Sequence, residues 1–196
     1  MSGNLPRGFK SAAERLAVAV RAELGLHPLA AIDCVRICGE FGIPIITAPE
    51  LVSSGASAKS VHRILAPDSR FSAMTVAAGT RRLIVYNPNH PAGRRANSLA
   101  HELSHILLEH PMSPALGDGG CRLWDSRLEA EADWQAGTLL VPRDAALAWM
   151  RSNGRIDEGA RHFGVSAALM QWRVNQTGIV RQLAASSIPP TRRRTA

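Results

Sequence analysis

Cysteine, aromatic residues and lysine are all scarce in this sequence. It has three cysteines among 196 residues, and a small, odd number cannot form the closed disulfide framework that holds small secreted domains together. We expect all three to be reduced thiols that serve packing rather than chemistry. Cys34 and Cys38 stand four positions apart, which would place them on one face of a helix.

Long apolar runs are absent as well. No segment approaches the roughly 20 uninterrupted apolar residues that a membrane span requires, because arginine, glutamate or proline interrupts each apolar stretch. Residues 1–10 lack the apolar core of a signal peptide. A composition with 45% hydrophobic and 20% charged residues is that of a globular domain. We therefore expect a cytoplasmic protein with no membrane partner.

The basic residues give the chain a net charge of +7 but do not form a nucleic-acid-binding pattern. Lys10 and Lys59 are the only lysines, and the arginines are spread along the chain. The arginine cluster at residues 192–194 follows two prolines in a terminal tail, and such tails are more often solvated than bound to bases. Nucleic-acid binding is therefore the less favoured alternative.

Hydrophobic periodicity and turn signals predict an α+β fold. Ser11 and Glu14 have the spacing of a capping box at the start of a helix over residues 11–24. Further helices are expected over residues 28–40, 92–109, 126–141, 144–152, 156–163 and 167–174. Strands are expected over residues 43–48, 72–77 and 82–86. Pro44 places the first strand near a sheet edge, and the other two flank a hairpin turn. Residues 49–70 show no strong periodicity and are predicted to be irregular.

These elements imply a small antiparallel sheet packed on helices, with a helical segment at the C-terminal end. The expected organisation is a flexible N-terminus over residues 1–10, a core domain over 11–142, a helix-turn-helix-like segment over 143–184 and a disordered basic tail over 185–196.

The helix expected over residues 92–109 contains an H-E-x-x-H motif, formed by His101, Glu102 and His105. Side chains four positions apart project from one helix face, so both imidazoles can bind one metal ion with Glu102 beside them. Zinc suits this arrangement because it accepts imidazole nitrogens and leaves a position open for water, which it acidifies. Glu102 would then act as the general base in peptide hydrolysis. The alternative is a polar patch on an amphipathic helix, but these groups are costly to bury beside apolar residues without a metal.

The motif does not extend in the way that metzincins require. The pattern H-E-x-x-H-x-x-G-x-x-H would need glycine where Leu108 stands and histidine where Pro111 stands. His110 misses the third-ligand position by one residue, and we do not expect it to bind the metal.

A better third ligand lies on the helix expected over residues 126–141. Glu129 can bind the metal while Asp133, four positions later, hydrogen-bonds a ligand imidazole and fixes its tautomer. This is the Glu-zincin arrangement. Glu131 lies about 200° from Glu129 around the helix and cannot share its site. The alternative for this stretch is an ordinary solvated helix face.

Two segments in this order and spacing resemble the ImmA/IrrE family of metallopeptidases. Residues 99–108 are similar to its motif helix, and residues 129–142 to its second segment, Glu-x-x-Ala-Asn/Asp-x-Phe-Ala-x-x-Leu-Leu-Met-Pro. Residues 82–88 and 160–166 resemble the segments before and after this core. The departures, which alter packing rather than chemistry, are Trp134, Gly137 and Val141.

The resemblance implies a minimal zincin-like core over residues 11–142, with His101, His105 and Glu129 as metal ligands and Glu102 as the general base. The metal would be zinc, with manganese and iron as alternatives. The implied substrate is a cytoplasmic helix-turn-helix (XRE-type) transcriptional repressor, whose cleavage relieves repression of a mobile-element or stress operon.

A further donor to the tetrahedral oxyanion is expected beside the metal. The candidates, each of which also has a structural interpretation, are Arg122, Tyr86, His110 and His162. Arg122 would be the first residue to replace.

A competing hypothesis is a DNA-binding regulator or toxin–antitoxin component in which the metal is structural. Residues 160–170 have the spacing of a helix-turn-helix, with Ser166 capping the second helix. That helix offers only three base-reading side chains, Gln171, Arg173 and Asn175. We favour the alternative that this helix pair packs on the core. A non-catalytic, metal-stabilised binding module is the other competing hypothesis.

Overall fold

The computed structural model describes residues 5–78, 81–111, 125–152 and 154–186. Within them the elements follow one another as α1 (Phe9–Glu23), α2 (Cys34–Glu40), β1 (Ile45–Thr47), the 3₁₀ helix η1 (Ala48–Leu51), α3 (Ala58–Leu65), β2 (Ala73–Ala78), β3 (Arg81–Tyr86), α4 (Ala92–Leu107), α5 (Ser126–Leu140), α6 (Arg143–Ser152), α7 (Ile156–Phe163), α8 (Ala167–Gln176) and α9 (Ile179–Ser186). The predicted α+β class is confirmed. In the described part of the chain, no helix combines the length and apolar character that a membrane crossing requires.

The sheet has the strand order β1-β3-β2. The predicted hairpin is confirmed, since β2 and β3 pair antiparallel with Ala73 opposite Tyr86. The expectation of an all-antiparallel sheet is wrong for β1, which pairs parallel with β3 and places Ile45 opposite Ile84. A parallel pair needs a crossover connection, and η1 and α3 supply part of it. The prediction that residues 49–70 are irregular is therefore also wrong. Of the eight residues in α3 only Val61 is buried, so its apolar pattern is too short to recognise.

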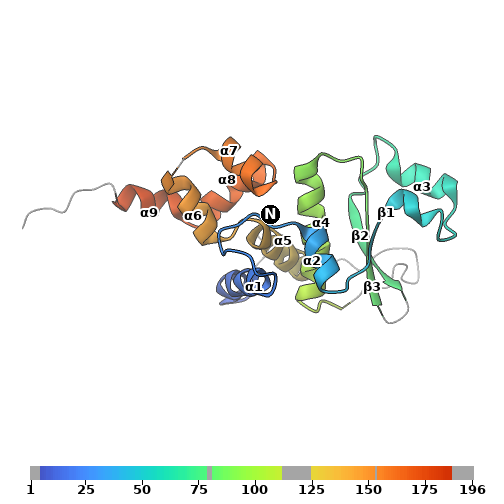
Figure 1. Cartoon of the computed structure of the whole chain (residues 1–196), viewed down its shortest axis with the longest axis horizontal. Helices are drawn as coiled ribbons and strands as arrows, with labels where there is room; N and C mark the ends of the chain where they lie inside the picture. Colours follow the sequence, from blue (N-terminus) through green and yellow to red (C-terminus); the bar gives the residue numbers. More distant parts are fainter. Residues whose placement is uncertain (1–4, 79–80, 112–124, 153, 187–196) are drawn as a thin grey trace, which may run out of the picture.

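The strongly periodic helices form where the sequence predicts them. Helix α4 lies between the sheet and α5, and α1 packs on α5 (Figure 1). The buried face of α4 includes Leu99, Ala100 and Leu103, which join the central hydrophobic core. The same core continues through α5 into the C-terminal helices α6–α9, which gather at the end of the molecule away from the sheet (Figure 1). The H-E-x-x-H helix is thus held rigidly between the sheet and a second helix.

The starts of two helices differ from the prediction. Helix α1 begins at Phe9, after Gly8 in a left-handed conformation (φ 83°), with no side-chain cap, so the predicted capping box at Ser11 is wrong. The Glu14 carboxylate is used elsewhere: it accepts hydrogen bonds from Nη2 of Arg173 (2.6 Å) and from the backbone N–H of Arg143 (2.9 Å). Tertiary contacts have replaced the local cap.

Helix α2 begins six residues later than expected because Asp33 is its N-cap, accepting a hydrogen bond from the Val35 N–H (2.9 Å). Cys34 and Cys38 are buried free thiols on this helix, as predicted. Burial raises the pKa of the Cys38 thiol to about 11, which keeps it protonated and unreactive at neutral pH. Cys121 lies outside the described residues.

The two helices of the helix-turn-helix-like segment form as predicted. Helix α7 ends at Gly164, whose left-handed φ of 67° makes the turn, and Ser166 caps α8 by accepting a hydrogen bond from the Leu169 N–H (3.1 Å). Helix α9 was not expected; it is anchored by Ile179, which is fully buried. All but the first two residues of the basic tail predicted over 185–196 lie outside the described residues.

Candidate metal centre

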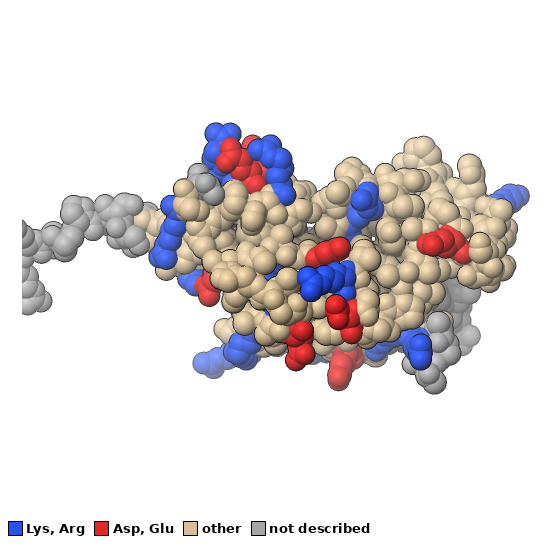
Figure 2. Space-filling view, in the orientation of Figure 1, with Lys and Arg blue, Asp and Glu red and all other residues tan. Residues whose placement is uncertain are grey.

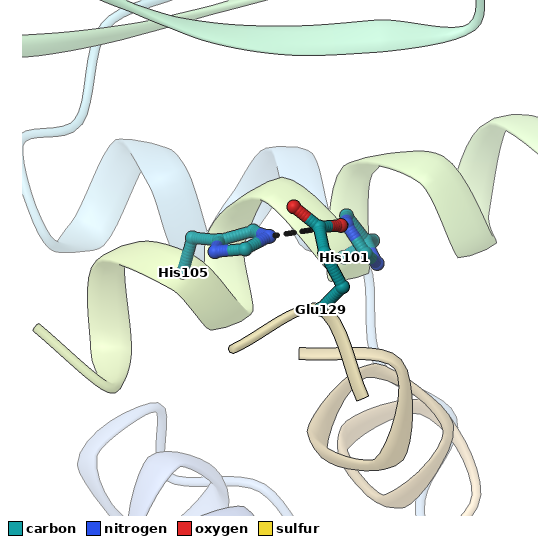
Figure 3. A group of neighbouring side chains, drawn as sticks. All are labelled: His101, His105 and Glu129. Carbon is teal, nitrogen blue, oxygen red and sulfur yellow. Dashed lines mark hydrogen bonds and ion pairs between the residues drawn. The ribbon is translucent and has the colours of Figure 1, made fainter. Parts of the chain in front are cut away.

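Helix α4 presents His101 and His105 side by side, one turn apart, toward the start of α5 (Figure 3). Their Nε2 atoms are 3.1 Å apart, and the two rings meet edge to face. Both Nε2 atoms therefore point into the same small space, as the spacing of the motif predicts.

Glu129 reaches this space from the first turn of α5. The helix is capped by Asp125, whose carboxylate accepts hydrogen bonds from the Arg127 and Leu128 N–H groups. Oε2 of Glu129 lies 3.2 Å from Nε2 of His101 and 3.8 Å from Nε2 of His105 (Figure 3). Each of the three residues offers one ligand atom, and these atoms all lie within 4.8 Å of one another.

These separations suit a tetrahedral metal ion. Two ligand atoms that each lie about 2.0–2.1 Å from a tetrahedral zinc are about 3.3–3.4 Å apart, and the three pairwise distances are 3.1, 3.2 and 3.8 Å. Two imidazole nitrogens and one carboxylate oxygen are also one of the donor sets that catalytic zinc sites use. The residues present therefore fit a bound metal ion without rearrangement of either helix.

Glu102 lies on the sheet side of α4 rather than among the three converging side chains. It is 5% exposed, and its Oε2 accepts a hydrogen bond from the Thr75 hydroxyl on β2 (2.8 Å). A carboxylate buried this deeply is costly in a purely structural role unless an opposite charge pairs with it. Beside a metal-bound water it would be placed to accept a proton.

The chain matches a known protein family over most of its length. A model of the peptidase M78 family, described as the IrrE N-terminal-like domain, matches residues 38–175. The chain belongs to the peptidase M78 family. The resemblance to ImmA/IrrE metallopeptidases is thereby confirmed, and with it a metal ion as the cofactor of this class of enzyme.

Two further comparisons add little. No curated protein matches the chain significantly. Among solved structures, a Mycobacterium tuberculosis transcriptional regulator is similar to this M78 chain at 19% sequence identity, with a TM-score of 0.46. The similarity covers 88% of this chain but only 48% of that protein, so the chain spans about half the length of the structure it matches.

Hydrogen bonds set the charge state of the M78 site. Burial opposes protonation of His101, but hydrogen bonds to Asp133 and Glu129 outweigh it and raise the pKa of His101 to about 9. Hydrogen bonds to His101 and His105 hold the pKa of the Glu129 carboxyl well below its usual range. In the absence of metal the site at neutral pH is therefore an ion pair, and a metal ion would take the place of the His101 proton.

The structure also brings Asp133 to the place that the sequence predicts. Its Oδ1 lies 2.8 Å from Nδ1 of His101, on the side of the ring opposite Glu129. A carboxylate in this position fixes the ring tautomer that leaves Nε2 free for a metal.

His105 has a different partner, which the sequence reasoning missed. Its Nδ1 lies 2.9 Å from Nδ1 of His110, and Nε2 of His110 lies 3.2 Å from Oε2 of Glu131. From the sequence, His110 was considered as a metal ligand or an oxyanion donor. Glu131 was excluded from the site of Glu129 and was otherwise considered part of a solvated helix face. His110 reaches Nδ1 of His105 because the chain turns back directly after α4, and Glu131 reaches His110 from α5.

The remaining oxyanion candidates are placed as follows. Arg122 lies outside the described residues. Tyr86 ends β3 and packs against the hydrophobic core. His162 stacks on Trp149 within the C-terminal helices, with ring centroids 4.8 Å apart.

Proposed function

We propose that this chain is a zinc-dependent endopeptidase that cleaves a cytoplasmic helix-turn-helix repressor and thereby relieves repression of a mobile-element or stress operon. The observation that carries the enzymatic part is the convergence of Glu129 Oε2 on the two Nε2 atoms, at 3.2 and 3.8 Å. Membership in a metallopeptidase family supports it. The repressor substrate, the operon and the cytoplasmic location rest on the resemblance to ImmA/IrrE proteins.

Each residue of the site has a distinct role in this proposal. His101, His105 and Glu129 would hold the metal, and zinc when bound would polarise the peptide carbonyl and acidify a water molecule. Glu102 would take the proton from that water and deliver it to the leaving amine. The Thr75 hydroxyl orients the Glu102 carboxylate through its 2.8 Å hydrogen bond. Manganese and iron are the alternatives to zinc.

The replacement of Glu102 by glutamine tests the proposal. This change removes the base but none of the proposed ligands, so we expect zinc content to stay equimolar while cleavage falls by at least 100-fold. The substrate to use is a small helix-turn-helix protein encoded beside this chain, incubated with and without a chelator. Glu40→Gln, at an exposed position on α2, is the matched control and should cleave normally. Retained cleavage by Glu102→Gln would contradict the role of Glu102 as the general base. If the variant keeps its metal and the repressor is still lost in cells, a non-catalytic binding module is favoured instead.

The packing of α8 argues against the DNA-binding alternative. Arg173, one of its three base-reading candidates, is fully buried and pairs with Glu14. The other two, Gln171 and Asn175, hydrogen-bond each other (3.0 Å). On the face that Figure 2 shows, basic side chains are scattered among acidic ones rather than gathered into a stripe. Steep salt dependence of duplex binding by the metal-free protein would restore this alternative.

A further inference from the structure

The two imidazoles of the candidate site are supported in different ways. His101 meets the Asp133 carboxylate directly, whereas a second imidazole stands between His105 and its carboxylate. The series runs from His105 Nδ1 to His110 Nδ1 (2.9 Å), and from His110 Nε2 to Glu131 Oε2 (3.2 Å).

The proposed metal site fixes the direction of both hydrogen bonds. A neutral imidazole that offers Nε2 to a metal must carry its proton on Nδ1. Nδ1 of His105 therefore donates, and Nδ1 of His110 must accept with its lone pair. The proton of a neutral His110 then resides on Nε2 and is donated to the Glu131 carboxylate. Glu131 thus selects the one tautomer of His110 that can accept from His105.

Four features of the fold hold His110 in place. Its side chain is only 5% exposed, and its backbone N–H donates to the His105 carbonyl (3.0 Å). The Arg82 guanidinium on β3 donates to the carbonyl oxygens of both His105 (3.3 Å) and His110 (2.9 Å). Between them, Glu109 adopts a left-handed φ of 54°, a conformation that non-glycine residues adopt only at some cost. The turn after α4 is therefore fixed so that the second imidazole faces the first.

We propose that His110 and Glu131 are a positioning pair that holds the ring of His105 in its metal-binding tautomer and orientation. They do not touch the metal themselves. The inference rests on the proposed metal site and adds residues that tune its affinity. Partners of this kind behind metal ligands contribute roughly 10- to 100-fold in affinity.

Zinc affinity of three variants, measured by competition with a chromophoric chelator, tests the pair. His110→Phe keeps the ring volume but removes the acceptor, and we expect zinc to bind 10- to 100-fold more weakly. His110→Asn places an amide oxygen near the Nδ1 position and should restore affinity to within about threefold of the unsubstituted protein. His90→Phe is the matched control, since His90 is a partly buried, hydrogen-bonded histidine outside the site; its affinity should not change.

A spectroscopic measurement on the unsubstituted, zinc-loaded protein gives a readout that a merely structural role would not produce. Long-range ¹H–¹⁵N spectra should place a proton on Nδ1 of His105 and on Nε2 of His110. A proton on Nδ1 of His110 would overturn the proposal even if His110→Phe failed to fold. Unchanged zinc affinity in a folded His110→Phe protein would overturn it as well, while leaving the proposed function intact. Failure of the unsubstituted protein to bind zinc would overturn both.

Discussion

The replacement of Glu14 by alanine is expected to destabilise the protein far more than its place on the first helix suggests. Arg173 is fully buried on α8, and its Nη2 lies 2.6 Å from Oε1 of Glu14. Its Nε donates to the Val141 carbonyl (2.8 Å), and Nη1 has no partner among the described residues. Without Glu14, the buried guanidinium would keep, among the described residues, one neutral hydrogen bond and the rings of Trp134 and Trp172 at 5.7 Å, but no opposite charge at contact distance.

The magnitude follows from the cost of an uncompensated buried charge. Removal of one member of a buried ion pair costs about 3–5 kcal/mol, and Oε2 of Glu14 also ceases to satisfy the Arg143 N–H. For a chain of this size, each kcal/mol lowers Tm by roughly 2–4 °C. We therefore expect Tm to fall by roughly 6–20 °C and the midpoint of urea unfolding to fall with it.

Two comparisons make the measurement specific. Glu23→Ala removes an exposed glutamate from the same helix and should change the free energy of unfolding by less than about 0.5 kcal/mol. The double variant Glu14→Leu with Arg173→Met replaces the pair by apolar side chains and should recover most of the loss. A loss below about 1 kcal/mol for Glu14→Ala would refute the reasoning, as would a double variant no more stable than the single one.

Three further predictions concern packing and the metal site. Gly137→Ala would place a Cβ 2.5 Å from Cζ3 of Trp172 and should lower the free energy of unfolding by about 1–3 kcal/mol in denaturant titrations. In the control, Gly39→Ala, the added Cβ has no neighbour within 4 Å, so this change should be neutral or slightly stabilising. Because the pKa of His101 is raised to about 9, its imidazole is protonated at neutral pH in the metal-free protein, and zinc must displace that proton. Apparent zinc affinity should therefore rise about tenfold per pH unit from pH 7 to 9 and then level off. Calorimetry that detects no proton release on zinc binding at pH 7.5 would contradict this. Zinc at 100 times its Kd should stabilise the protein by about 2.7 kcal/mol in thermal unfolding, and this gain should vanish in Glu129→Ala.

The sequence alone determined the parts of the site that follow from a repeating local geometry. His101 and His105, and likewise Glu129 and Asp133, lie four positions apart within helices, and an α-helix places such pairs on one face whatever surrounds it. The hairpin of β2 and β3 was predictable for the same reason, because alternation and a turn signal specify it locally.

Only the tertiary structure decided where the helices meet. The carboxylate of Glu131 reaches His110 across 21 positions of the chain, and Glu14 reaches Arg173 across 159. In the sequence, Glu131 looks like part of an ordinary charged helix face and Glu14 like part of a helix cap. Nothing local distinguishes a solvated glutamate from one that pairs with a distant buried group. Their roles depend on how helices and strands pack, and that is set by burial of the whole apolar core rather than by the order of neighbouring residues.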